Sequence, residues 1–545
     1  MKTKIVVALL FAIFAGLAIS SMLQQSGTCD EIAHHIPVGV VMMTKGDLKL
    51  DTSQPPLSRY ITALPVVLFL NPRLPQNRAE WRTDDRASFG RDFFFKYNNH
   101  PKQMLFASRL MIVFVGLLCG LVVFLWSRSL FGLKTALFSL FLYVFSPDIL
   151  AHTQLATTDM AATFFILLSI YIFWRFVNNQ NNFNLTAAGI SLGLAQLSKY
   201  SALILYPIFI LLFIFVFPKI KQQKGKNILL QALLIFMISI IVVWGGYGFR
   251  LEPVLKDAMR QNEKLELINA KVSSLPFWNE NAKNKLDNFL LHVPVPLGEH
   301  ILGTMGIFRH EERGHRTYFL GTWSEKGNIL YFAVAFLIKM PIPIIFFLAT
   351  GLFVCLCKKS SPENYFLILP PLVYFIVALL CGLQIGVRHL LPMYPFCFMI
   401  AARSISLARY KSFAFILILV SLWYAVSSYM IWPHYLSYFN ESVGGPNNGW
   451  KYLRDSNIDW GQDLPALGEY IKKNNINEIS FLYFGQDNPS LYGINFKKFS
   501  NEEFIKPENR VYAVSVQCLD SITWTKNLSP TAKAGYSIFI YDFRK

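Results

Sequence analysis

Long apolar runs recur along the whole chain and constrain its fold more than any other feature. A run of roughly 17–25 apolar residues is long enough to cross a bilayer as a helix. Charged residues make up 15% of the sequence, against about 25% in soluble domains. The sequence therefore predicts a mainly α-helical, polytopic membrane protein with about eleven transmembrane helices, over residues 5–23, 104–126, 135–151, 160–177, 185–198, 201–217, 228–246, 329–354, 365–381, 390–405 and 412–432.

The distribution of charge predicts the orientation of these helices. The formal net charge is +18, and in membrane proteins Lys and Arg accumulate in cytoplasmic loops. If the N-terminus is inside, the cytoplasmic loops hold clusters of Lys and Arg and a single acid, Glu363. We therefore expect a protein of the cytoplasmic (inner) membrane with no nucleic-acid partner. A cleaved signal peptide at residues 5–23 is the rival interpretation, since residues 18–21 resemble a cleavage site.

This orientation divides the chain into a transmembrane core, 1–432, and a small α/β domain on the outer side, 433–545. Two long loops of the core, 24–103 and 247–328, also face the outer (periplasmic) side. Residues 61–70 are too short to span a bilayer and are expected to form an interfacial helix. In the C-terminal segment, Asp463 is expected to cap a helix that ends near Asn474. Alternating patterns predict strands at 478–484, 510–516 and 536–541.

Charged residues at the predicted helix ends are the candidates for chemistry. Asp30 and Glu31 follow the first span, and Asp159 lies between the third and fourth. Lys199 separates the fifth from the sixth, and Arg388-His389 opens the tenth. All of them fall on the outer side in the predicted orientation. Carboxylates beside cations suit a reaction in which a carboxylate accepts a hydroxyl proton while cations hold a phosphate leaving group.

Each candidate also has a structural interpretation that the sequence leaves open. Asp30 and Glu31 could end a helix in solvent, and Asp159 could cap the fourth span. Lys199 could be a lysine that extends toward the membrane surface. Asp30 and Asp159 could together bind a divalent cation, although two carboxylates alone do not establish a metal site. The seven cysteines have no metal-ligand spacing and suggest no disulfide framework.

Several of these segments resemble a known family. They are Asp30-Glu31, the Pro-Pro-Leu sequence at 55–57, Asp159, and the stretches 318–324 (YFLGTWS), 385–392 (IGVRHLLP), 433–440 (PHYLSYFN) and 455–464 (DSNIDWGQDL). Together they resemble the protein O-mannosyltransferase and aminoarabinose transferase branch of the GT-C glycosyltransferases, and in particular its prokaryotic, phospholipid-carrier-dependent (family 39-like) members. The resemblance extends over nearly the whole chain.

The resemblance implies an inverting transferase that moves a sugar from a polyprenyl phosphate (undecaprenyl or dolichyl) to an acceptor hydroxyl on a protein, lipid or glycan. It makes Asp30 the general base, with the carboxylates of Glu31 and Asp159 beside it. The substrate-binding candidates that it implies are Lys199, Arg388, His389, Pro56 and Arg59.

One position departs from the family pattern. Gln54 stands where the eukaryotic mannosyltransferases usually have a histidine before Pro-Pro-Leu, which leaves protein mannosylation in doubt. The motif at 455–463 has no role that the sequence reveals, and helix capping and docking onto the core is its structural interpretation. The rival function is a secondary transporter or lipid flippase. Transporters place ionisable residues near the bilayer midplane and often contain inverted repeats, whereas here the charges lie at one surface and no repeat is visible.

Overall fold

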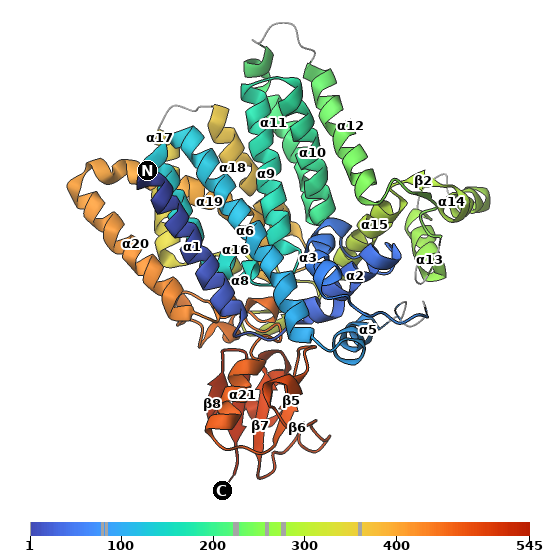
Figure 1. The fold of residues 1–545 in the computed structure, drawn as a ribbon, viewed down its shortest axis with the longest axis vertical. Coiled ribbons are helices and arrows are strands. Elements are labelled where there is room, and N and C mark those ends of the chain that lie inside the picture. The colour runs from blue at the N-terminus through green and yellow to red at the C-terminus, as the bar shows by residue number, and fades with distance from the viewer. Residues whose placement is uncertain are drawn as a thin grey trace.

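The fold is known from a computed structural model that describes residues 2–77, 81, 85–221, 228–256, 261–273, 279–357 and 362–544. Apolar helices form a bundle, and a sheet near the C-terminus lies at one end of it (Figure 1). The helices up to α12 are α1 (Lys2–Met22), α2 (Ile36–Lys45), α3 (Pro56–Phe69), α5 (Arg86–Asp92), α6 (Pro101–Phe131), α7 (Leu133–Val144), α8 (Pro147–Thr153), α9 (Asp159–Asn178), α10 (Asn182–Ser198), α11 (Leu205–Lys221) and α12 (Ile228–Gly246).

The later helices lie on both sides of this bundle (Figure 1). They are α13 (Gln261–Val272), α14 (Glu280–His292), α15 (Gly298–Arg313), α16 (Tyr331–Lys339), α17 (Ile342–Cys357), α18 (Pro362–Leu380), α19 (Tyr394–Ala401), α20 (Lys411–Ile431) and α21 (Leu464–Lys473). A 3₁₀ segment, η4 (Val387–Met393), precedes α19, and another, η5 (Ala402–Arg409), follows it. Two short hairpins pair β1 (Leu251–Glu252) with β2 (Val295–Pro296) and β3 (Thr317–Phe319) with β4 (Thr322–Ser324).

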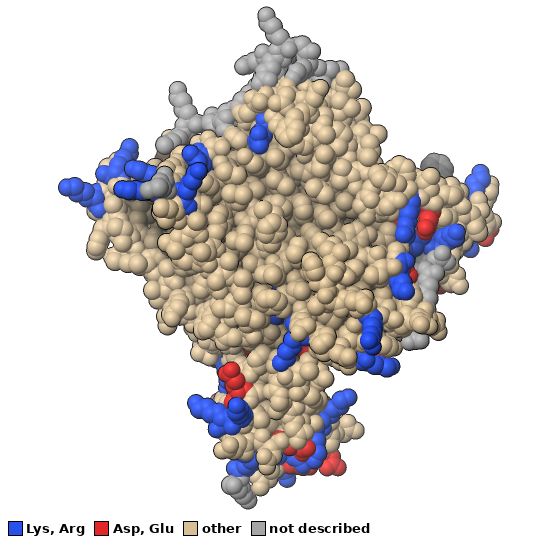
Figure 2. Space-filling view, in the orientation of Figure 1, with Lys and Arg blue, Asp and Glu red and all other residues tan. Residues whose placement is uncertain are grey.

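The apolar helices agree with a multi-pass membrane protein. Among the described residues, six helices are long and apolar enough to cross a bilayer, and the number rises to eight if each of two bent pairs is one span. Three further apolar helices are shorter. Figure 2 shows a broad belt of this surface that lacks charged side chains, with Lys and Arg gathered beyond it. The total of eleven spans stays a prediction.

Two predicted spans are broken rather than continuous. The run expected at 135–151 bends by 62° between α7 and α8, and the run expected at 329–354 bends by 107° between α16 and α17. A proline marks each break: Pro147 is the first residue of α8, and Pro341 lies between α16 and α17. Proline lacks an N–H group and disfavours helical dihedrals in the residue before it. Met340 accordingly has an extended backbone, with φ −77° and ψ 132°.

Small residues bring α10 and α12 close together. A Cβ atom at Gly189 would lie 2.6 Å from Ile238, and one at Gly193 would lie 2.6 Å from Val242. Close packing of this kind is typical of helix pairs in membranes. It fixes the position of α10, whose C-terminal end carries Lys199.

The C-terminal sheet has five strands in the order β6-β5-β7-β9-β8. They are β5 (Ile479–Leu482), β6 (Phe496–Lys497), β7 (Val511–Ser515), β8 (Ala532–Ala534) and β9 (Ile538–Asp542). β5 is parallel to β6 and β7, whereas β9 is antiparallel to β7 and β8. The three predicted strands correspond to β5, β7 and β9, and the predicted interfacial helix corresponds to α3.

Asp463 does not cap α21 as expected. Its side chain makes no capping hydrogen bond and instead accepts hydrogen bonds from Ser537 Oγ, at 2.8 Å, and from the backbone N–H groups of Tyr536 and Ser537. The carboxylate therefore joins the start of α21 to the β8–β9 turn. The segment before it, 433–463, contacts the helical core, so the expected boundary of a separate domain at 433 remains a prediction.

Candidate active site

The turn after α1 places two adjacent carboxylates in different environments. Asp30 precedes a short π-helical segment, η1 (Glu31–His35), and the two side chains have different partners, Arg388 for Asp30 and Arg109 for Glu31. The Asp30 side chain is 30% exposed, whereas Glu31 is fully buried. Only Asp30 is therefore open to a substrate.

Arg388 connects Asp30 to Asp159. Its Nη1 lies 3.2 Å from Asp30 Oδ2 and 3.9 Å from Asp159 Oδ2. The preceding Gly386 has φ 152°, and a Cβ atom there would lie 2.3 Å from Ser456 Oγ. A side chain would not fit, so glycine lets the loop approach residue 456 closely and present Arg388 to the carboxylates.

Lys199 completes the charged cluster. Its Nζ lies 2.6 Å from Asp159 Oδ1, and Thr157 Oγ1 donates to Asp159 Oδ2 at 3.1 Å. Asp159 is the first residue of α9, and Lys199 directly follows α10. The structure thus brings together four residues that the sequence placed at one membrane surface, two carboxylates and two cations from four distant segments.

The pKa of Asp30 is set by two opposing influences. Burial favours the neutral acid and raises the pKa, but the positive charge of Arg388, with smaller contributions from His35 and His34, outweighs burial. The net effect is a pKa below the usual value of 3.8. Asp30 is therefore a carboxylate at neutral pH, and its pairing with Arg388 makes it a weaker base.

Arg388 keeps one donor without a partner. Its guanidinium carbon lies 4.1 Å from the centroid of the Trp460 ring. Its Nε is buried and has no hydrogen-bond partner among the described residues. A buried N–H group without an acceptor is costly in a protein. An anion that reached Arg388 would supply the missing acceptor.

An apolar cavity of about 520 Å³ reaches Lys199 and His389. Its walls come from the segment 199–207, from α15 and from α18, and they are mainly apolar. Gln54 and Glu311 are among its polar lining residues. The cavity can therefore hold an apolar chain whose polar end lies beside the charged cluster.

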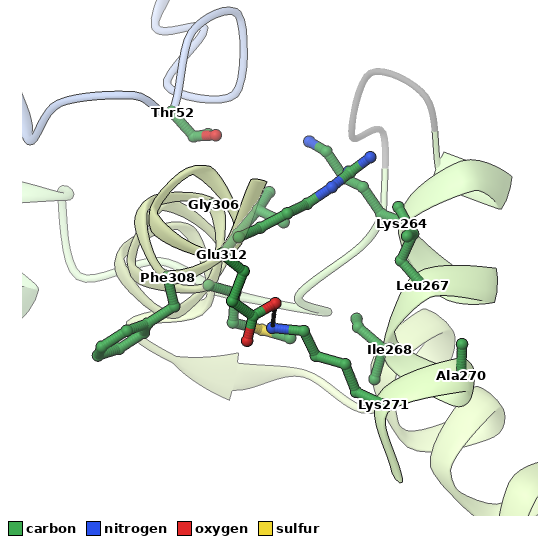
Figure 3. A pocket seen from close by; sticks show the side chains of 12 residues that line it. Thr52, Lys264, Leu267, Ile268, Ala270, Lys271, Gly306, Phe308 and Glu312 are labelled. Atoms are coloured by element: carbon green, nitrogen blue, oxygen red, sulfur yellow. Dashed lines mark ion pairs between the residues drawn. The ribbon is translucent and has the colours of Figure 1, made fainter. Parts of the chain in front are cut away.

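Another cavity lies on the far side of α15. It has a volume of about 710 Å³, lies between α13 and α15, and includes no member of the charged cluster. Figure 3 shows the ion pair between Lys271 and Glu312 that spans the gap between these two helices. Phe308 lines this cavity and also the one at Lys199, so the two are neighbours across α15.

Three other predicted site residues are engaged in the protein itself. Glu31 pairs with Arg109 at 2.7 Å. The buried Arg59 donates to Asp51 Oδ2, also at 2.7 Å. Pro56 is buried and begins α3, where its fixed φ suits the first turn of a helix. The structure does not place Glu31, Arg59 or Pro56 against the cluster of Asp30, Asp159, Lys199 and Arg388.

The residues present do not form a divalent-cation site. Arg388 and Lys199, rather than further oxygen ligands, surround Asp30 and Asp159. Across the described parts of the chain, no group of three or more His, Cys, Asp or Glu side chains could hold a metal ion. Calcium and magnesium need several oxygen ligands, so no step of the chemistry below is assigned to a metal.

The sequence interpretation missed Arg109, which is buried within α6. It donates to both oxygens of Glu31 and to the backbone carbonyl oxygens of Met22, Gln25 and Ser26. An arginine inside an apolar run was the available signal, because a charge there needs a partner. Arg109 holds the turn that carries Asp30.

Residues 455–463, whose role the sequence left open, bind both sides of the charged cluster. On one side, the backbone N–H of Cys29 donates to Trp460 O at 3.0 Å, and the N–H of Ser26 donates to Gln462 O at 3.0 Å. On the other side, Val387 N–H donates to Asn457 Oδ1 at 2.9 Å. The motif therefore connects the Asp30 turn to the Arg388 turn.

Comparison with known protein families gives one match. A sequence model of the family described as dolichyl-phosphate-mannose-protein mannosyltransferase matches residues 89–253, which include Asp159 and Lys199. A search of curated proteins finds no match. The family match confirms the resemblance seen in the sequence and indicates a glycosyltransferase.

Three solved structures are also similar to this chain. ArnT from Cupriavidus metallidurans bound to undecaprenyl phosphate is 11% identical, with a TM-score of 0.45 over 98% of this chain and 97% of that one. The apo oligosaccharyltransferase of Archaeoglobus fulgidus is 16% identical, with a TM-score of 0.48 over 82% and 57%. The S. cerevisiae Pmt1-Pmt2 complex bound to the sugar donor is 20% identical, with a TM-score of 0.36 over 45% and 33%. These TM-scores are below 0.5, so the function is inferred from the family match and the site.

Proposed function

We propose that this protein transfers a sugar from a polyprenyl-phosphate donor to an acceptor hydroxyl at the outer face of the cytoplasmic membrane. The observation that carries the proposal is the cluster of Asp30, Asp159, Lys199 and Arg388 beside an apolar cavity. A polyprenyl-phosphate sugar matches this arrangement, because its anionic phosphate and polar sugar suit the charged cluster and its apolar chain suits the cavity. The family match supports a lipid-phosphate-linked sugar as the donor.

The donor phosphate binds Arg388 and Lys199 in this proposal, and its lipid occupies the cavity that Lys199 lines. Charge-assisted hydrogen bonds from these cations would hold the phosphate. The unpartnered Nε of Arg388 gains an acceptor at the same time. Asp159 keeps Lys199 in position before the donor arrives.

Donor binding also prepares Asp30 for its role as general base. When Arg388 binds the donor phosphate, the positive charge that lowers the pKa of Asp30 is partly neutralised. Burial, which raises this pKa, then has the larger effect. The carboxylate becomes a stronger base once the donor is in place.

The reaction is a single displacement at the anomeric carbon of the sugar. Asp30 accepts the proton of the acceptor hydroxyl as the hydroxyl oxygen forms a bond to that carbon. The bond from the carbon to the phosphate oxygen breaks, and the electron pair leaves with the polyprenyl phosphate. Arg388 and Lys199 stabilise the charge that develops on the leaving phosphate. The product carries the inverted anomeric configuration.

The acceptor belongs to one of three classes, a protein, a lipid or a glycan, each of which can present a hydroxyl to Asp30. A transporter or flippase is the alternative function, and it would hold its charged residues near the middle of the spanning helices. The charged cluster instead lies where α1, α9, α10 and η4 begin or end, which favours the transferase.

The test is the Asp30→Asn variant in detergent or nanodiscs, incubated with polyprenyl-phosphate sugars and acceptors and analysed by mass spectrometry. We expect transfer to fall by about 10²–10⁴-fold, the range for loss of a general base, while donor binding persists. The exposed Asp92→Asn variant is the matched control, since Asp92 lies outside the cluster. Wild-type turnover in Asp30→Asn would refute the role of Asp30, and lipid movement without sugar transfer would favour the transporter.

A further inference from the structure

We infer that a second cleft, where the C-terminal sheet meets the helical core, binds an acidic saccharide. The cleft has a volume of about 570 Å³ and is distinct from the cavity at Lys199. Its walls come from three separate parts of the chain, which are the β3 hairpin, the segment 447–454, and residues 519–541. None of the proposed reacting groups lines it.

Aromatic rings form part of the wall of this cleft. Tyr318, Phe539 and Tyr541 are buried in it, whereas Trp450 is only half-buried. The ring of Trp450 packs edge-on against Phe539, with centroids 5.2 Å apart, which fixes its orientation. The C–H groups of a pyranose present an apolar face that packs on such a ring. Trp450 is therefore a suitable platform for a sugar.

Side-chain amides supply the polar groups that sugar hydroxyls need. Asn447, Asn448 and Asn527 line the cleft. In the described part of the chain, no partner bonds to the side chain of Asn447 or Asn527. An amide both donates and accepts hydrogen bonds, so these two can bind hydroxyl groups without first breaking an internal bond.

The charge of the cleft selects an acidic ligand. Lys451, Lys526 and Lys533 line it, and none of the three forms an ion pair with a described carboxylate. The one acidic side chain in the wall, Asp520, is already paired with Arg454 at 2.7 Å. The excess of positive charge attracts anions, so a carboxylated or phosphorylated sugar fits better than a neutral one. Figure 2 shows that Lys and Arg on the visible face of the C-terminal unit are interspersed with Asp and Glu, so the positive charge that matters is the local excess among the residues lining the cleft.

This inference does not depend on which sugar the transferase moves. The ligand could be the acceptor glycan or a glycan that only anchors the enzyme, and both share the same acidic sugar chemistry. A kinetic measurement of sugar transfer distinguishes an acceptor glycan from an anchoring glycan. Loss of cleft binding raises the KM for an acidic glycan acceptor in the first case and leaves the KM unchanged in the second.

The test measures binding of hexagalacturonate and of the neutral maltohexaose to the purified full-length protein in detergent. We expect hexagalacturonate to bind at least tenfold more tightly than maltohexaose. Its binding should weaken as salt is raised from 50 to 500 mM, because the distance over which exposed charges attract shrinks from about 10 Å at 0.1 M salt to about 3 Å at 1 M. The Lys451→Glu/Lys526→Glu variant should lose at least tenfold in affinity. Trp450→Leu should weaken binding of both probes, if thermal unfolding shows that it is folded.

A matched control is Lys472→Glu/Lys473→Glu on α21, which reverses two exposed charges outside the cleft and should leave binding unchanged. An equal loss in this control, no saturable binding, or tighter binding of poly-glutamate than of hexagalacturonate would overturn the inference. Asp30→Asn should bind the probe as the wild type does. Failure of the cleft and failure of the proposed transferase are therefore distinguishable.

Discussion

The buried ion pair between Glu31 and Arg109 provides a test of which carboxylate reacts. Glu31 receives hydrogen bonds from Arg109 Nε and Nη2, from the backbone N–H and hydroxyl of Thr28, and from the N–H of Ala156, all at 2.7–2.9 Å. Both of its oxygens are thus occupied, and none of the donors is a substrate. We expect Glu31 to be a positioning residue that fixes the turn bearing Asp30.

The expected loss of folding stability follows from the burial of this ion pair and from the number of hydrogen bonds that each variant removes. Arg109→Met leaves the Glu31 carboxylate buried without its cation, which costs about 3–5 kcal/mol for a buried pair. It also leaves three backbone carbonyl oxygens without the donor they now have. Glu31→Gln keeps the shape but removes the charge, and we expect a smaller cost of about 2–3 kcal/mol. The Glu31→Gln/Arg109→Met double variant should lose less than the sum, because neither charge is then left alone.

The assay combines thermal unfolding in detergent with single-turnover transfer. Burial raises the pKa of Glu31, but Arg109 and the hydrogen bonds outweigh it, so the pKa lies below the usual 4.5. The stabilisation is therefore complete at neutral pH and lost as pH falls below that value. We expect both single variants to unfold at a lower temperature than the wild type. The single-turnover transfer rate should fall more in the variant whose melting temperature falls more, because the same turn carries Asp30. If Glu31→Gln unfolds like the wild type and yet loses transfer by 10³-fold, which is about 4 kcal/mol of barrier, Glu31 is a reacting group and the positioning role is refuted.

Two further predictions concern the donor site and pH. Lys199→Met removes the 2.6 Å contact with Asp159 and one of the two cations that hold the phosphate. The KM for the donor should therefore rise about 10–100-fold, the range for a charge-assisted hydrogen bond. Lys199→Arg should restore part of the donor affinity, and an unchanged KM in Lys199→Met would contradict the phosphate role. Burial raises the pKa of Asp459 to about 7, so the folded protein binds a proton there that the unfolded chain releases near pH 4, and stability should fall as pH rises from about 4 to 7, by up to about 1.4 kcal/mol per unit. Asp459→Asn should flatten the decline in melting temperature between about pH 4 and 7, and an identical decline in both proteins would show that another group causes it.

The charged cluster could be predicted because its members are anomalous in their sequence context. Asp30, Asp159, Lys199 and Arg388 each interrupt or border an apolar run, and such residues need a partner or water. The alternation of positive loops then placed them on one side of the membrane. The structure brings these four residues together. Convergence was predictable because helices that cross one bilayer bring their ends to only two surfaces.

Roles within the cluster were less accessible to the sequence. Glu31 and Asp30 are neighbours with the same chemistry, yet Glu31 is fully buried and pairs with Arg109, whereas the Asp30 side chain is 30% exposed and pairs with Arg388. Arg59 was expected to contact substrate, but Asp51, eight residues away, holds it. The breaks before Pro147 and Pro341 depend on whether neighbouring helices tolerate a kink, which an apolar run does not reveal. The local sequence pattern therefore predicts where a helix or strand lies more readily than it predicts which partner a single side chain contacts.

The motif at 455–463 explains how segments so far apart in the chain form one site. Asp30 and Arg388 are separated by most of the transmembrane core, yet their nearest polar atoms lie 3.2 Å apart. The Asp30 turn bonds to Trp460 and Gln462, and the Arg388 turn bonds to Asn457. Trp460 also packs against the Arg388 guanidinium. Because the Asp30 turn and the Arg388 turn both bind residues 455–463, hydrogen bonds to this one segment limit how far either turn can shift relative to the other. A charged pair joined only by its own attraction would have no such constraint, and a misplacement of about 1 Å is enough to lower the rate by 10²-fold.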